Sequence, residues 1–139
     1  MSTLTKVLER NISQIEKNAN MKEGRFRLGH HLMPPVGWLN DPNGLCWYKG
    51  RYHVFFQYAP FDVEGGLKFW GHYTSEDLLD WKYEGTALYP DSSYDCHGVD
   101  SGSSLIDQDK MHLFFTGNVK IDGDYDYINE GRETSTLHV

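Results

Sequence analysis

The spacing of apolar residues changes once along the chain. Near the start, four of them recur at helical spacing with charged residues between them: Leu4, Leu8, Ile12 and Ile15. This spacing predicts an amphipathic helix over residues 3–20, within a leader and connector that occupies residues 1–29. Residues 30–139 instead show short aromatic runs divided by Gly, Pro, Asn and Asp. That punctuation is typical of an all-β domain.

One pattern occurs twice in the β region. Lys49–Tyr58 resembles Gln108–Gly117, and each copy is a turn followed by a strand with His-x-Phe-Phe. His53 and His112 in these copies lie 59 positions apart, and we expect both to be strand residues with a satisfied ring nitrogen. Further strands are predicted before and between the copies, at Gly44–Tyr48, Phe69–Thr74, Trp81–Leu88 and Ser103–Ile106.

Four strands per repeat is the layout of a β-propeller blade. About 110 residues after the leader suffice for two blades, whereas propellers typically close with about four or more. We therefore expect the first part of a longer protein. Two blades alone would expose apolar faces and strand edges, which favours self-association into an oligomer.

Charge and composition exclude several classes of function. A net charge of −7 argues against a nucleic-acid partner, because a basic patch is needed to neutralise phosphates. Aromatic residues make up 14% of the chain, which suits β-sheets and carbohydrate-facing surfaces. No apolar run is long enough for a membrane span or a secretory signal, so we expect a cytoplasmic protein. Cys46 and Cys96 match no zinc or redox spacing and are expected to be free thiols.

The segment Trp-Leu-Asn-Asp-Pro-Asn-Gly, Trp38–Gly44, is the strongest candidate for chemistry. Asp-Pro-Asn-Gly by itself predicts a tight turn with no further role. Here Trp38 precedes the turn and Asn40 stands beside Asp41. An aromatic surface, an amide and a carboxylate within four residues are the parts of a sugar-binding subsite.

This segment resembles the Trp-Met-Asn-Asp-Pro-Asn-Gly signature of glycoside hydrolase family 32, the β-fructofuranosidases. Further family motifs follow in the family's order: Phe55–Tyr58, Phe69–His72, Ser75–Trp81, Ala87–Asp91 and Asp100–Ser103. The resemblance implies a five-bladed propeller, of which this chain would hold the first two blades. It also implies hydrolysis of a terminal β-fructoside, such as sucrose or sucrose 6-phosphate, with no cofactor.

The resemblance also assigns roles to residues. Asp41 would be the nucleophile of a retaining mechanism. Asn40, Gln57 and Ser101 would hydrogen-bond the fructose hydroxyls, and Trp70 would form an apolar wall of the pocket.

Two positions depart from the family pattern. Many relatives have a Trp-Gly pair where this chain has Glu64–Lys68, so the pocket wall and sugar specificity are expected to differ. Relatives commonly have Phe or Tyr where this chain has Asp100. The 59-residue offset also aligns Asp41 with Asp100, which predicts that both face one pocket, where Asp100 binds a sugar hydroxyl or raises the pKa of its neighbour. A solvated turn aspartate is the alternative.

The family's general acid lies in a Glu-Cys motif and its transition-state stabiliser in Arg-Asp-Pro, and this sequence contains neither. We therefore expect no useful turnover from these 139 residues alone. Two other interpretations are a non-catalytic fructoside-binding module and a self-assembling propeller fragment. If a phosphate is recognised, Lys49, Arg51 and Lys68 could contact it.

Two segments have the residue types of metal ligands without the spacing. His30 and His31 are followed by no third ligand. Asp122–Asp126 lacks the central Gly and terminal Glu of a calcium loop, so we expect an exposed acidic loop and no metal.

Overall fold

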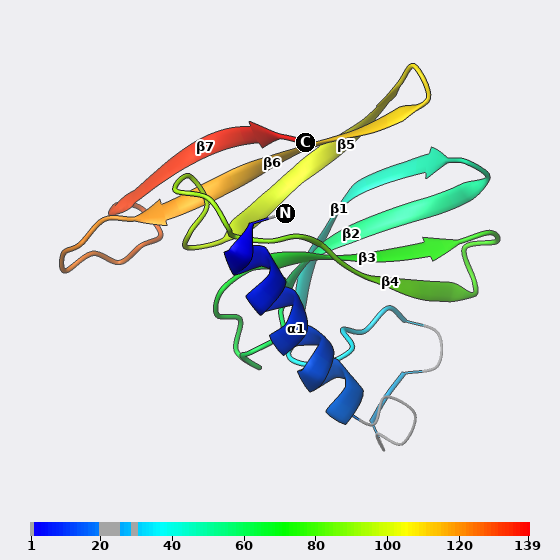
Figure 1. Ribbon diagram of the computed structural model, residues 1–139, viewed down its shortest axis with the longest axis horizontal. Coiled ribbons are helices and arrows are strands. Elements are labelled where there is room, and N and C mark those ends of the chain that lie inside the picture. The colour runs from blue at the N-terminus through cyan, green and yellow to red at the C-terminus, as the bar shows by residue number, and fades with distance from the viewer. Residues whose placement is uncertain (1, 20–25, 29–30) are drawn as a thin grey trace.

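The computed structural model describes residues 2–19, 26–28 and 31–139. Its elements are one helix and two antiparallel sheets (Figure 1). The first sheet has the strand order β1-β2-β3-β4 and the second has the order β5-β6-β7. Their bounds are α1 (Thr3–Asn18), β1 (Trp38–Tyr48), β2 (Arg51–Ala59), β3 (Phe69–Ser75), β4 (Trp81–Leu88), β5 (Val99–Asp107), β6 (Lys110–Lys120) and β7 (Arg132–His138).

The all-β prediction is confirmed, and each predicted strand coincides with an observed one. β4 matches its prediction at both ends, and β1, β5 and β6 extend beyond theirs. β7 was not predicted, because Arg132–His138 contains a single large apolar residue. Its strand conformation comes from pairing with β6. This pairing begins where Phe114 of β6 lies opposite His138.

Helix α1 is anchored at both ends on the first sheet and the segment after it. Ser2 caps the helix by accepting a hydrogen bond from the backbone N–H of Thr5, and Thr5 donates its hydroxyl to Asp91. Near the other end, Glu16 accepts hydrogen bonds from the hydroxyls of Tyr58 and Tyr83, at 3.0 and 2.8 Å. The predicted helix is therefore confirmed, although it ends at Asn18.

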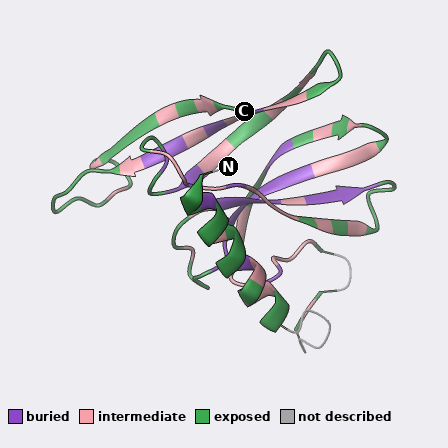
Figure 2. Cartoon of the chain, in the orientation of Figure 1, coloured by how far each residue is buried: buried purple, intermediate pink, exposed green. Residues whose placement is uncertain are grey.

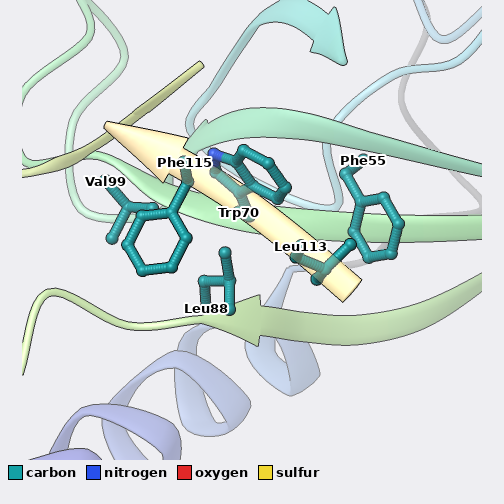
Figure 3. Packing of buried hydrophobic residues seen from close by; sticks show 6 residues of the cluster. All are labelled: Phe55, Trp70, Leu88, Val99, Leu113 and Phe115. Carbon is teal, nitrogen blue, oxygen red and sulfur yellow. The ribbon is translucent and has the colours of Figure 1, made fainter. Parts of the chain in front are cut away.

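Alternate residues of the first sheet supply two separate hydrophobic clusters, because neighbouring side chains of a strand point to opposite faces. On one face, Phe56, Tyr58, Phe69 and Tyr73 pack with Ile12 of α1. The other face packs against the second sheet, and Figure 3 shows the buried residues of that interface: Phe55, Trp70, Leu88, Val99, Leu113 and Phe115. The buried parts of β2 and β3 therefore lie between α1 and the second sheet (Figure 2).

The repeated His-x-Phe-Phe segment builds the same arrangement in each sheet. His53 Nδ1 lies 2.9 Å from Nε2 of His72, and His112 Nδ1 lies 2.9 Å from Nε2 of His138. His72 also stacks on Phe55, which lies opposite it, and His138 stacks on Phe114 in the same way. The prediction that His53 and His112 are strand residues with satisfied ring nitrogens is confirmed.

Several remaining predictions concern chemistry away from the sheets. Cys46 and Cys96 are free thiols. Asp122–Asp126 is an exposed loop, and within the described ranges no three His, Cys, Asp or Glu side chains are grouped as metal ligands. His30 lies outside the described residues, and His31 is exposed. Across the described part of the chain, no helix has the length and apolarity to cross a bilayer.

Candidate active site

Asp41 lies on a double irregularity in β1, and not in a hairpin turn. β1 pairs regularly with β2 up to Asn40, then shifts register between Asn40 and Pro42 and again between Asn43 and Cys46. Asp41 has a φ of 44°, and its carbonyl accepts a hydrogen bond of 2.8 Å from the Asn43 side chain. Bulges re-aim side chains and are frequent beside active sites. The Asp-Pro-Asn-Gly segment therefore continues the strand and leaves the Asp41 side chain exposed.

A chain of side-chain hydrogen bonds leads from the aromatic residue to this carboxylate. Trp38 Nε1 donates to Asn40 at 3.0 Å, and Asn40 Nδ2 donates to Gln57 at 2.9 Å. Gln57 Nε2 donates to the hydroxyl of Ser101 at 3.1 Å, and that hydroxyl donates to Asp41 Oδ2 at 3.5 Å. The last contact is long for a hydrogen bond. Five residues named from the sequence thus lie in one network that crosses from the first sheet to the second.

Asp100 lies at the start of β5, next to Ser101 and beside a bulge between Asp100 and Gly102. Its Oδ2 accepts a hydrogen bond of 3.1 Å from Asn118 on β6. Burial raises the pKa of Asp100, and the nearby charge of Asp41 raises it further, although Asn118 opposes the shift. The two carboxylates therefore lie within electrostatic range at the same end of the two sheets, as the 59-residue offset predicts.

Trp70 occupies a different position from the expected pocket wall. Its side chain is 0% exposed and lies in the core between the sheets, in contact with Leu88, Val99 and Phe115. Its indole Nε1 donates to the backbone carbonyl of Asp100 at 3.1 Å. Trp70 therefore holds the backbone at the start of β5 in place from within the core between the two sheets.

Lys68 is the site residue whose placement sequence reasoning missed. It immediately precedes β3, and its backbone carbonyl accepts a hydrogen bond of 3.0 Å from Val99 of the second sheet. Burial lowers the pKa of its half-buried amine, and the carboxylates of Asp100, Asp41 and Asp62 oppose that shift. A cation thus lies within electrostatic range of both site carboxylates. The sequence singled out Lys68 as a possible phosphate contact and placed it in the segment that departs from the family pattern, but gave no position relative to the carboxylates.

A comparison with known protein families decides the relationship. Residues 31–135 match the model of the glycosyl hydrolases family 32 N-terminal domain. The chain belongs to glycosyl hydrolase family 32. The resemblance expected from the sequence motifs is therefore confirmed, and the two sheets correspond to the N-terminal portion of the propeller in this family's solved enzymes.

Individual members of family 32 cover different shares of the chain. Sucrose-6-phosphate hydrolase of Bacillus subtilis (strain 168) is 54% identical over 90 residues, which are 65% of this chain and 19% of that protein. The β-fructofuranosidase BmSUC1 of Bombyx mori superimposes with a TM-score of 0.80 at 33% identity, over 96% of this chain and 27% of that one.

A mutant of the same Bombyx mori enzyme, solved in complex with sucrose, gives a TM-score of 0.78 at 34% identity over 99% of this chain and 27% of that one. This family 32 chain therefore spans about a fifth to a quarter of the length of the relatives that it matches.

Proposed function

We propose that this chain carries the nucleophile-bearing part of a fructoside hydrolase, with Asp41 as the nucleophile of a retaining reaction. The observation that supports this most directly is the bulge in β1, which presents an exposed carboxylate beside the hydroxyl of Ser101. The family membership and the relatives named as sucrose-6-phosphate hydrolase and β-fructofuranosidase support the reaction class.

In a retaining glycosidase, one carboxylate attacks the anomeric carbon and a second protonates the leaving group. Asp41 is suited to the first task because its side chain is exposed, so an anomeric carbon can reach it, and it lies beside the hydroxyl of Ser101. The resulting bond would be an ester between Asp41 and a fructosyl unit. Water that is activated by a general base would then release fructose.

The remaining site residues are proposed to hold the sugar. Asn40 and Gln57 present amide groups that already hydrogen-bond each other, which fixes their orientation before substrate arrives. Ser101 and Asp100 approach from the second sheet and would bind further hydroxyls. We propose a small fructoside of the sucrose class as substrate, and the relative that was solved with sucrose supports this class.

The nucleophile can be tested on this chain with a substrate whose leaving group needs little protonation. The chain is incubated with a β-fructofuranosyl fluoride, and its intact mass is measured over time. We expect the mass of one fructosyl unit to be added to Asp41, because breakdown of the ester needs the second catalytic group. Peptide mapping then locates the ester.

Asp41→Asn should reduce this labelling by about 10³-fold or more, since an amide is a poor nucleophile. Asp109→Asn is a matched control, because Asp109 is also an exposed aspartate with a positive φ, of 59°, but lies in the turn between β5 and β6. Labelling that survives in Asp41→Asn would refute the assignment. Sugar binding by the unmodified chain without any ester would instead support the non-catalytic binding module.

A further inference from the structure

Three basic residues were candidates for contact with a charged substituent of the substrate, and their positions separate them. Lys49 lies in the turn between β1 and β2 and Arg51 begins β2, both at the opposite end of β1 from Asp41. Arg51 is paired with Glu76 at 2.8 Å, and the amine of Lys49 lies over the ring of Tyr48. Lys68 alone among these three lies at the site.

The side chain of Lys68 is held at the rim by two neighbours. Its Nζ donates to the backbone carbonyl of Gly65 at 2.6 Å and lies 5.8 Å from the centroid of the Trp38 ring. Gly65 has a φ of +99°, and a Cβ there would lie 2.8 Å from the lysine Nζ. A glycine at position 65 therefore makes room for the amine beside the indole. Since Trp38 is 39% exposed, this group forms an outer edge of the site.

Because of the other charges of the site, a cation at this edge distinguishes between an anionic and a neutral substrate. Asp41 and Asp100 give the site a negative potential, which would repel a substrate that carries its own negative charge. Lys68 lies within range of both carboxylates and offsets them, whereas Arg132 is within range of Asp100 and donates to the carbonyl of Ile128. A neutral sugar needs no such offset. A lysine ammonium has three N–H donors, so donors besides the one used on Gly65 can meet an anion.

We propose that Lys68 is a specificity-determining residue that binds a phosphate group on the substrate, at the rim formed with Trp38 and Gly65. This inference rests on the proposed function and deepens it, because it selects a phosphorylated fructoside over a neutral one. The phosphate would lie beside the fructosyl position, on the part of the sugar that extends towards Trp38. The amine then acts as a charge-assisted donor that a neutral sugar does not engage.

Calorimetric titration of the whole chain with sucrose and with sucrose 6-phosphate tests this. We expect Lys68→Met to weaken binding of sucrose 6-phosphate about 10- to 100-fold, as for loss of a hydrogen bond to a charged group. Binding of sucrose should change less than about twofold. Lys49→Met is the matched control, since it removes the same charge from an exposed lysine at the far end of β1, and it should change neither affinity.

Each other outcome has a defined meaning. Equal losses for both sugars in Lys68→Met, or no loss for either, would overturn the proposal. Discrimination that is lost in Arg132→Met but kept in Lys68→Met would assign the phosphate to the second sheet and also overturn it. Inorganic phosphate that binds as tightly as sucrose 6-phosphate would indicate an anion site unrelated to the sugar. If the unmodified chain binds neither sugar, the proposed function itself fails, whereas equal binding of both sugars refutes only the role of Lys68.

Discussion

Mild acid should destabilise the first sheet through His72. This ring is half-buried, stacks on Phe55 with 4.3 Å between ring centroids, and places its Nε2 2.9 Å from Nδ1 of His53. Burial and, to a smaller extent, the neighbouring His53 together lower the pKa of His72 from 6.5 to about 4, against a smaller opposing effect of Glu84. Because His53 can donate from Nε2 to the carbonyl of Tyr48, at 3.2 Å, its Nδ1 is free to accept from His72.

The direction of the effect follows from the lowered pKa. The unfolded chain binds a proton at His72 more readily than the folded chain does, so protonation favours unfolding. The stabilisation is complete above pH 6.5 and is lost as the pH falls from 6.5 to about 4. That separation corresponds to an upper limit of about 3.4 kcal/mol at about 1.36 kcal/mol per pH unit. Since water reaches part of the ring, we expect about 2 kcal/mol.

Urea unfolding at a series of pH values between about 7.5 and 4.5 measures this quantity as the change in the free energy of unfolding. His72→Gln keeps an N–H close to the position of Nε2 but cannot titrate, so its free energy of unfolding should vary less with pH by about 2 kcal/mol. His138→Gln is the control, because His138 makes the same contacts with His112 and Phe114 but is exposed to water. A pH dependence that is unchanged in His72→Gln would refute the reasoning.

Two further predictions concern stability. Glu16→Ala leaves the hydroxyls of Tyr58 and Tyr83 without their acceptor, at a cost of about 1–3 kcal/mol for a buried hydroxyl, and should lower the free energy of unfolding by about 2–4 kcal/mol in urea. Glu16→Gln keeps an acceptor and should cost less than half as much. Gly102→Ala would place a Cβ 1.9 Å from the backbone carbonyl oxygen of Phe114, and should lower the free energy of unfolding by about 3 kcal/mol. It should also weaken sugar binding, and urea unfolding and sugar titration can both be measured on one preparation. Sugar binding as strong as in the unmodified chain would show that the bulge at the start of β5 does not position the site.

The fold was predictable from the sequence where local pattern and tertiary packing agree. α1 and β4 follow from the spacing of their apolar residues, and the repeat placed β2 and β6 in equivalent positions. β7 was missed because its alternation is polar and its conformation depends on a partner strand. Asp-Pro-Asn-Gly was interpreted as a turn because those residues favour tight turns, yet β2 pairs on both sides of the segment and holds it as a bulge.

The site was predictable in its members but less so in their arrangement. Asn40, Gln57, Ser101 and Asp41, which the family motifs singled out, form one hydrogen-bond network, and their roles toward a sugar stay predictions. Trp70 was expected to line the pocket, but its indole is 0% exposed. A motif does not indicate which face of a strand packs against the neighbouring sheet. Lys68 was named only as a possible phosphate contact, without a position, because its approach to both carboxylates depends on the contact of its amine with the carbonyl of Gly65, which no local pattern indicates.

The paired histidines bear on how an array of such sheets can be lengthened. Phe55 and His72 are cross-strand partners on the covered side of the first sheet, and Phe114 and His138 are the corresponding partners on the second. Phe55 is buried against the neighbouring sheet, whereas Phe114 is half-buried and His138 is exposed. The second sheet therefore repeats the imidazole–phenyl surface with which the first sheet meets its neighbour. A duplicated module with this surface can receive a further sheet without a new set of side chains, which would make propeller blades readily interchangeable units for evolution and for protein engineering.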